Sequence, residues 1–480
     1  MAAIFTNFFS LGAAQAFSIL LGVICYPLLI QQLGFEGMGY VAFCFLLLIS
    51  LQIFDGGISA NMVRITAGCT QNNTTLFASK MFVTTQSIFF LVGLTSIAIS
   101  SAYFALSVDG IHPKSDIIYY IISLIVSIKF IQIPAKAIVQ GNERFKLLAV
   151  MNICFNLARY PAPILIFLIF TPEIVYYLNI LLAFVMLETI VLLNSSFRIV
   201  ALWGHTSASS ICKLFDLRVL LRTLNESRVL WVLSVVWIVC SQFDKLALKW
   251  SVQIDLFGMV MSALALTNLM ITFSSLFTQV LIPRLSSILK DKSSNKYKGA
   301  LSNTINLYVV ILMPISIFGC YYAHDILSIW SGNEYFADQF YFFTALIIIG
   351  NFIHGLNNFG FIEAVVREDL ANYANSIIPV SLFCSAFSLA GVLIFGYMTI
   401  PVMWLITMVL ITRQYAWSRL RDNNIRSILR TEFMYVIVCM IIPSGIFLIT
   451  FGHGLITAIV ALMNCIVLTI YRVRYSGMGF

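Results

Sequence analysis

The dominant pattern along the chain is a succession of long hydrophobic segments separated by short polar ones. A segment of about 20 apolar residues can cross a bilayer as a helix. The segments show no alternation of apolar and polar positions, and lipid satisfies no backbone hydrogen bonds, so helices are predicted rather than barrel strands. The pattern predicts about 14 spans, at approximately 8–30, 38–60, 81–105, 117–139, 147–170, 173–194, 230–250, 256–283, 303–323, 339–361, 374–397, 398–417, 433–450 and 454–472.

These spans predict an all-α polytopic membrane protein. The eleventh and twelfth spans are separated only by Tyr397–Pro401, so they are the pair most open to miscounting. The composition agrees with the pattern, since 60% of the residues are hydrophobic and 10% are charged. Soluble domains are typically about 45–50% apolar, so a soluble globule is excluded.

The positive charges predict the orientation of the chain. Lys and Arg total 21 in the loops after even-numbered spans and in the C-terminal tail, against one, Lys114, in the loops after odd-numbered spans. The positive-inside rule then places both termini in the cytoplasm, and it favours an even number of spans. The net charge of +8 follows from this topology. No basic soluble domain suits nucleic acid, so a nucleic-acid partner is not expected.

The most polar connection suggests how the chain is organised. We expect an N-terminal six-helix lobe at 1–195, a cytoplasmic basic linker at 196–229, a C-terminal six-helix lobe at 230–420 and an additional C-terminal helix pair at 421–480. The basic amphipathic part of the linker is typical of a segment that lies along anionic headgroups. A shift of 221 residues aligns Gly37 with Gly258 and brings Arg64 within one residue of Arg284, which indicates two pseudo-symmetric lobes around a central cavity.

Four cations interrupt the hydrophobic spans: Lys129, Lys136, Arg159 and Lys245. A cation near the centre of a spanning helix costs about 2.5–3.5 kcal/mol on insertion scales, so accident is a poor explanation for four of them. Steps of three and four residues place Lys129, Gln132 and Lys136 on one helix face, and Pro134 is expected to kink that span. The next span has a comparable polar face, formed by Asn152, Asn156 and Arg159.

Two interpretations of these cations remain open. They form ion pairs with acids on other helices, for which the candidates are Asp55, Glu188, Asp244 and Glu363, or they line a water-filled cavity that attracts anions. Asp55, Glu188 and Asp244 are also candidates for coupling transport to an ion gradient. A second polar face could accommodate sugar or could be packing between helices; its members are Asn268, Gln279, Asn351, His354 and Asn358.

The usual signatures of enzymes are not found in the sequence. It contains no G-x-S-x-G, H-E-x-x-H or P-loop motif, and no soluble domain of a size to hydrolyse ATP. Its 10 cysteines are scattered without a C-x-x-C pair, so neither a disulfide framework nor a zinc site is expected. We therefore expect no enzymatic activity, no cofactor and no metal. Transport would draw on an ion gradient, the membrane potential or the gradient of the substrate.

Several short motifs resemble those of the polysaccharide transporter family, the Wzx-type flippases. The first is Leu33-Gly34-x-x-Gly37-x-Gly39-Tyr40, followed by Asp55-Gly56-Gly57 and Arg64. Further matches are Gln140-Gly141-Asn142-Glu143-Arg144-Phe145, then Asp244-Lys245, Gly258 and Pro283-Arg284. The sequence departs from the family where Met259, Val260 and Met261 follow Gly258, because the family usually has an aromatic residue there.

The resemblance implies a fold and a function. The family has two six-helix lobes around a central cavity and moves undecaprenyl-diphosphate-linked oligosaccharides, such as O-antigen repeat units, to the periplasmic leaflet of the bacterial inner membrane. It implies the lipid-linked sugar and membrane lipids as partners, and polymerase and chain-length proteins of the same pathway as further ones. The alternatives are a cation-coupled multidrug exporter of the same fold, a flippase for another lipid-linked precursor, and a membrane scaffold for glycan assembly.

Overall fold

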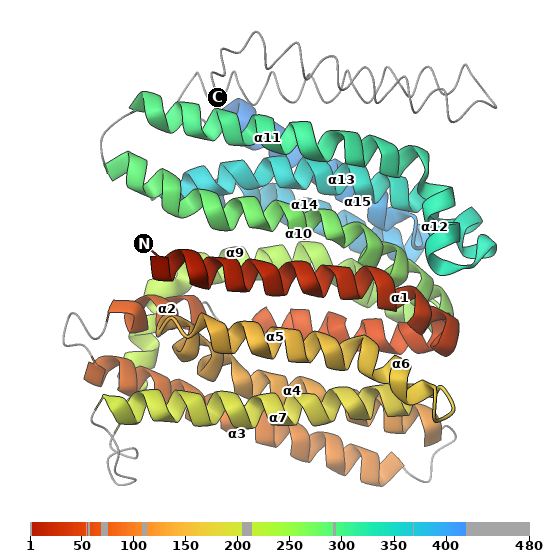
Figure 1. The fold of residues 1–480 in the computed structure, drawn as a ribbon, viewed down its shortest axis with the longest axis horizontal. Helices are drawn as coiled ribbons and strands as arrows, with labels where there is room; N and C mark the ends of the chain where they lie inside the picture. The colour runs from red at the N-terminus through yellow and green to blue at the C-terminus, as the bar shows by residue number, and fades with distance from the viewer. Residues whose placement is uncertain are drawn as a thin grey trace. The chain divides into compact units, whose positions relative to one another are not determined.

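Every regular element that the structure describes is a helix, as predicted (Figure 1). The computed structural model describes residues 2–53, 55, 58–68, 75–107, 113–203, 214–290, 294–367 and 369–418. The helices are α1 (Ala2–Ser50), a short 3₁₀ turn η1 (Leu51–Ile53), α2 (Ile58–Gly68), α3 (Thr75–Ser107), α4 (Pro113–Gly141), α5 (Phe145–Arg159), α6 (Pro161–Phe167), α7 (Ile174–Leu202), α9 (Leu217–Ser251), α10 (Ile254–Lys290), α11 (Ser294–Tyr321), α12 (Ala323–Ser331), α13 (Glu334–Val366), α14 (Leu370–Phe395) and α15 (Thr399–Ser418).

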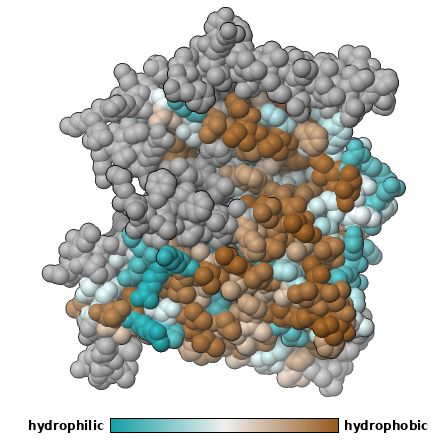
Figure 2. All heavy atoms as spheres, in the orientation of Figure 1, coloured by the Kyte–Doolittle hydropathy of each residue, from teal (hydrophilic) through white to brown (hydrophobic). Residues whose placement is uncertain are grey.

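The surface of the described residues carries large apolar side chains, as a protein surrounded by lipid requires. Ile329, Phe395 and Ile169 are among the most exposed of them, and Figure 2 shows hydrophobic residues over much of the visible face. Contiguous apolar surface of this kind does not suit water. Ten of the described helices are long and apolar enough to cross a membrane. The chain is therefore a multi-pass membrane protein.

The difference between these ten helices and the predicted spans has identifiable sources. The first two predicted spans both lie in α1, which breaks at Gly34 with φ 68° and ψ 176°. A continuous helix of this length would measure about 73 Å, more than twice the thickness of the hydrocarbon core. The twelfth span corresponds to α15, whose apolar part, Thr399–Gln414, is shorter. The thirteenth and fourteenth spans, 433–450 and 454–472, lie outside the described residues.

Turns and helix breaks separate the spans where sequence signals are strong. The doubtful eleventh and twelfth spans are two helices, because α14 ends at Gly396, whose positive φ of 77° reverses the chain. The fifth span is interrupted at Tyr160, and Pro161 then begins α6, where a residue without N–H is tolerated. The expected kink at Pro134 does not end α4, which continues as one helix to Gly141.

The chain forms two compact units. Unit 1 comprises Met1–Gln242 and Val252–Gly258, and unit 2 comprises Phe243–Ser251 and Met259–Phe480. In unit 1, α4 packs against α3, α7 and α2, and α5 packs against α1. The core around α4 contains Phe82, Phe89, Phe130 and Ile138. Gln86 of α3 also donates to the carbonyl of Ile131, beside the carbonyl that Pro134 leaves without its helical partner.

Unit 2 repeats the pairing of helices seen in unit 1. Here α13 packs against α15, α12 and α11, and α14 packs against α15. Its core is centred on Tyr308, Phe352 and Phe359. The shift of 221 residues carries Pro113, the first residue of α4, onto Glu334, the first residue of α13. The two helix bundles therefore have corresponding elements, which supports the internal duplication inferred from sequence.

The polar connection between the predicted lobes is shorter in the structure than in the sequence prediction. The preceding helix α7 extends to Leu202, and α9 runs unbroken from Leu217 to Ser251. The basic stretch predicted to lie along the membrane surface is thus largely the first part of α9. Asp216 precedes this helix: its Oδ1 accepts from the N–H of Arg218 at 3.1 Å, and its Oδ2 lies 3.3 Å from Lys80 Nζ of α3.

We expect the Asp216–Lys80 interaction to stabilise the protein above acidic pH. The hydrogen bond from Lys80 holds the pKa of the Asp216 carboxyl below its usual value. A depressed pKa means that this contribution is fully present above the unfolded-state pKa of about 3.9 and is lost as pH falls through the folded-state pKa. Asp216→Asn should lower the thermal midpoint in detergent at pH 7 and have little effect at pH 3. An equal effect at both pH values would contradict the ionic role.

Two glycines allow backbones to approach closely within unit 1. A Cβ on Gly258 would lie 1.9 Å from the carbonyl oxygen of Phe35, and one on Gly39 would lie 2.3 Å from the carbonyl oxygen of Ile254. Both distances are far shorter than any non-bonded contact, and backbone atoms cannot rotate aside. The first turn of α10 therefore packs directly on the part of α1 that follows Gly34. The turns that carry the sequence repeat are in contact with each other.

We predict that Gly258→Ala and Gly39→Ala each destabilise the protein, because the new methyl group separates these backbones. A drop of about 1–3 kcal/mol is typical of overpacking, and it should appear as a lower thermal midpoint of the purified protein. Gly299→Ala is the matched control, since nothing lies within 4 Å of the new Cβ. In the interior of α11 the control should be neutral or stabilising by about 0.5–1 kcal/mol. Equal midpoints for all three variants would refute the contact.

Candidate functional site

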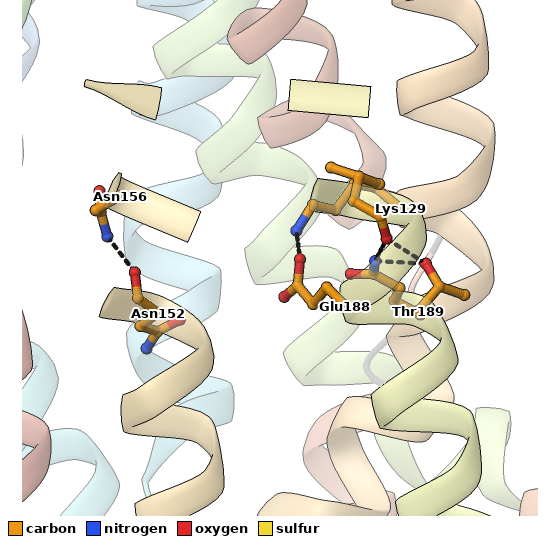
Figure 3. Close-up of polar contacts among 7 residues, drawn as sticks. Lys129, Asn152, Asn156, Glu188 and Thr189 are labelled. Carbon is orange, nitrogen blue, oxygen red and sulfur yellow. Dashed lines mark hydrogen bonds and ion pairs between the residues drawn. The ribbon is translucent and has the colours of Figure 1, made fainter. Parts of the chain in front are cut away.

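The cation Lys129 lies in the interior of unit 1 in an ion pair. Its Nζ is 2.5 Å from Oε2 of Glu188 on α7, and the two side chains are 18% and 13% exposed (Figure 3). The same Nζ lies 4.2 Å from the centroid of the Phe155 ring. The acid on α7 thus compensates the charge on α4, which resolves the two interpretations of Lys129 in favour of pairing in this structure.

Gln132 fixes α4 against α7 one turn further along. Its Nε2 donates to the carbonyl of Val185 at 3.0 Å and to Oγ1 of Thr189 at 2.7 Å. Figure 3 shows Thr189 beside Glu188 on the same turn of α7. Gln132 is almost fully buried, so its amide nitrogen positions the helices and leaves the pairing of Lys129 with Glu188 geometrically defined.

The guanidinium of Arg159 is held in a different way, by aromatic rings. Its Cζ lies 3.6 Å from the centroid of Phe45 and 4.9 Å from that of Tyr160. Within the described ranges of the chain, no carboxylate lies within ion-pair distance of Arg159. Cation–π contacts stabilise a desolvated guanidinium by about 2 kcal/mol and leave its charge uncompensated. Arg159 is also the last residue of α5, where the helix dipole favours a cation.

The two cations belong to one array of alternating charges and rings. Phe155, beneath Lys129, makes an edge-to-face contact with Phe45, beneath Arg159, with centroids 6.4 Å apart. The sequence analysis missed these aromatic residues. Phe155 lies four residues before Arg159, so it had a helical-spacing signal. Phe45 had none, because it comes from another helix.

The remaining predicted residues of this group lie around the array. Lys136 is exposed on α4, and its positive charge acts on Lys129. Asn156 donates to Oγ of Ser18 at 2.8 Å and to the carbonyl of Asn152 at 2.7 Å (Figure 3). The side chain of Asn152 is exposed. This part of unit 1 therefore carries three cations and one acid, and the surplus charge is positive.

The fourth cation, Lys245, is in unit 2 beside its own acid. Oδ1 of Asp244 accepts from the backbone N–H and the Nζ of Lys245 at 2.8 and 3.1 Å. Oδ2 accepts from Oγ of Ser388 at 3.2 Å. Asp55, the other acid singled out from sequence, accepts from the N–H and the hydroxyl of Ser59 at the start of α2. Its contacts are those of a helix cap.

The predicted polar face of unit 2 forms hydrogen bonds between its own helices. Nδ2 of Asn351 donates to the carbonyl of Thr267 at 3.0 Å, and its Oδ1 accepts from the indole N–H of Trp404 at 2.9 Å. The ring of His354 is buried 5.8 Å from that of Trp404. Asn358 is half-buried and Asn268 is exposed. The side chain of Gln279 is outside the described residues.

A known protein family matches well over half of the chain. The model of the family described as "Polysaccharide biosynthesis protein" covers residues 32–338. The chain belongs to this family. The resemblance inferred from the short motifs is thereby confirmed. No curated protein matches the sequence.

Solved structures of transporters share the fold of this polysaccharide biosynthesis protein. The lipid II flippase MurJ, in an inward closed conformation, has a TM-score of 0.62 at 15% identity, covering 97% of this chain and 98% of MurJ. An inward-facing multidrug resistance MATE transporter of the MOP superfamily also scores 0.62, at 12% identity with 86% and 95% covered. A MOP superfamily transporter from Pyrococcus furiosus scores 0.51 at 13% identity, with 89% and 96% covered. These neighbours are transporters or flippases rather than enzymes.

We expect Asn351 to act in stability, because its amide joins α13 to α10 and α15. Asn351→Ala would leave the carbonyl of Thr267 and the N–H of Trp404 buried without these partners, at a cost of about 1–3 kcal/mol per group. The thermal midpoint of the purified protein should fall. Asn358→Ala, on the same helix, is the control and should change the midpoint little. A normal midpoint for Asn351→Ala together with lost transport would instead assign Asn351 to the substrate.

Proposed function

We propose that this polysaccharide biosynthesis protein is a flippase for an undecaprenyl-diphosphate-linked oligosaccharide, such as an O-antigen repeat unit. It would move the headgroup from the cytoplasmic to the periplasmic leaflet of the bacterial inner membrane, with both termini in the cytoplasm. The family assignment and the shared fold with a lipid II flippase support a lipid-linked substrate. Membrane lipids are partners, and polymerase and chain-length proteins would act on the delivered sugar.

The observation that carries this proposal is the uncompensated guanidinium of Arg159 in an apolar interior. Its contacts within the described residues are aromatic rings, while Lys129 nearby has an acid of its own. A charge maintained at this cost in a membrane protein marks a substrate pathway. A diphosphate diester carries two negative charges, and the planar fork of Arg binds phosphate oxygens in pairs.

The proposed roles follow from the contacts of each side chain. Arg159 binds the diphosphate directly, and Lys136 attracts it from an exposed position on α4. Exposed amides such as Asn152 and Asn268 suit the hydroxyl groups of a sugar. Alternating access, in which two lobes rock around a central cavity, remains the mechanism that we propose. An ion gradient would drive it, for which Glu188, Asp244 and Asp55 are the acids considered.

The likeness to a multidrug transporter favours a second candidate, a cation-coupled exporter of organic cations. The charge of unit 1 argues against it, because three cations and one acid repel a cationic drug. The transporter from Pyrococcus furiosus is a useful parallel, since reverse polarity of its binding pocket suggested a different function. Loss of surface glycan on deletion, with unchanged drug sensitivity, would separate the two candidates.

We predict that Arg159→Ala abolishes complementation of a flippase-null strain, because the only direct anion ligand without an acid partner is removed. Loss of charge-assisted hydrogen bonds of about 1.5–3 kcal/mol corresponds to a drop in affinity of roughly 10- to 100-fold. Arg159→Lys, which keeps the charge, should retain part of the activity. The measurement is surface glycan in cells with equal amounts of each protein.

Lys146→Ala provides the matched control for this experiment. Lys146 is on the same helix, α5, and is exposed near its first residue, so the substitution removes the same charge outside the array. Its surface glycan should be normal. Normal glycan from Arg159→Ala as well would show that the charge of Arg159 has no part in transport.

A further inference from the structure

Lys129 and Arg159 differ in what already occupies them. Both lie in the aromatic array of unit 1, but only Lys129 has a carboxylate, at 2.5 Å, in the described part of the chain. Arg159 requires no contact with an acid to be broken before it binds an anion. Lys129 can give its ammonium to a phosphate only if it loosens its contact with Glu188.

The position of Glu188 is fixed independently of Lys129. Thr189, the next residue on α7, accepts from Gln132, and so does the carbonyl of Val185 one turn earlier. These bonds keep the two helices in register when the ion pair opens. Glu188 therefore stays within reach of Lys129 and can re-form the pair when an anion leaves.

A carboxylate and a phosphate oxygen compete for the same donor hydrogens of an ammonium group. We propose that Glu188 is an internal competitor of the substrate: it holds Lys129 in the resting state, weakens anion binding and restores the resting ion pair after release. This inference rests on the proposed function and adds a release role for a residue that does not itself bind the substrate. Glu188 acts through Lys129, so it is a positioning residue.

The role has a physical rationale in a transport cycle. A site with all its cations unpaired would bind a diphosphate tightly and release it slowly, because affinity differences are expressed mostly in dissociation rates. A competing carboxylate lowers the affinity and also satisfies Lys129 when the site is empty. An unpaired ammonium in an apolar interior would otherwise destabilise the protein.

The test measures binding of farnesyl diphosphate to the purified full-length protein at fixed ionic strength, by titration calorimetry. Glu188→Gln should bind about tenfold more tightly than wild type, since the substitution removes the competing charge on an almost equal volume. Transport of lipid-linked sugar by the same variant should fall, because release is slowed. Tighter binding with lower turnover is a combination that a merely structural role would not produce.

Glu173→Gln is the matched control, because it removes the same charge from an exposed position at the N-terminus of α7. Its affinity should equal that of wild type. If Glu188→Gln does not give folded protein, Glu188→Asp keeps the charge on a shorter side chain and should raise the affinity at least threefold. The effect of Glu188→Gln should also shrink below threefold in a Lys129→Gln background.

The outcomes separate this inference from the proposed function. Binding by wild type with no gain in Glu188→Gln or Glu188→Asp would overturn the role of Glu188 and leave the flippase proposal intact. An equal gain in Glu173→Gln would also overturn it, because the effect would then be general electrostatics. Failure of wild type and all variants to bind farnesyl diphosphate would overturn both proposals together.

Discussion

Positive charge in an apolar interior is the constraint on which the arrangement of unit 1 depends. Desolvating a cation is so costly that each one needs either a counter-ion or a polarisable partner. Lys129 has the carboxylate of Glu188, and this pair joins α4 to α7. Arg159 has the faces of Phe45 and Tyr160. The first solution neutralises its charge and the second preserves it, which is why the two cations have different proposed roles.

The two units share their helix pairing and differ in their charges. The shift of 221 residues places Gly350 at the position of Lys129 and Asn357 at that of Lys136. Gly350 lies so close to Trp404 that a Cβ there would be 2.5 Å from the indole. Asn357 donates to the carbonyl of Met408 and accepts from Thr412. Duplication thus preserved the scaffold, while neutral groups that pack or bond between helices stand where unit 1 has cations.

Much of the fold could be predicted from the sequence, because hydrophobic length alone identifies spanning helices. The order of the helices and the separation of α14 from α15 follow from apolar segments and turn glycines. The helical face of Lys129, Gln132 and Lys136 followed from residue spacing. The partner of each cation could not be deduced, because Glu188 is 59 residues from Lys129 and Phe45 is on a different helix from Arg159. Such contacts depend on tertiary packing, which a single sequence does not encode in any local pattern.

The central claim is that the positive interior of unit 1 serves to carry a lipid-linked diphosphate across the membrane. Its most direct test is translocation of labelled undecaprenyl-diphosphate-linked oligosaccharide in proteoliposomes, followed by the access of an external glycosidase to the sugar. Wild-type protein should expose the sugar, Arg159→Ala should not, and Lys146→Ala should match wild type. Equal translocation by wild type and Arg159→Ala, or none by wild type, would contradict the account.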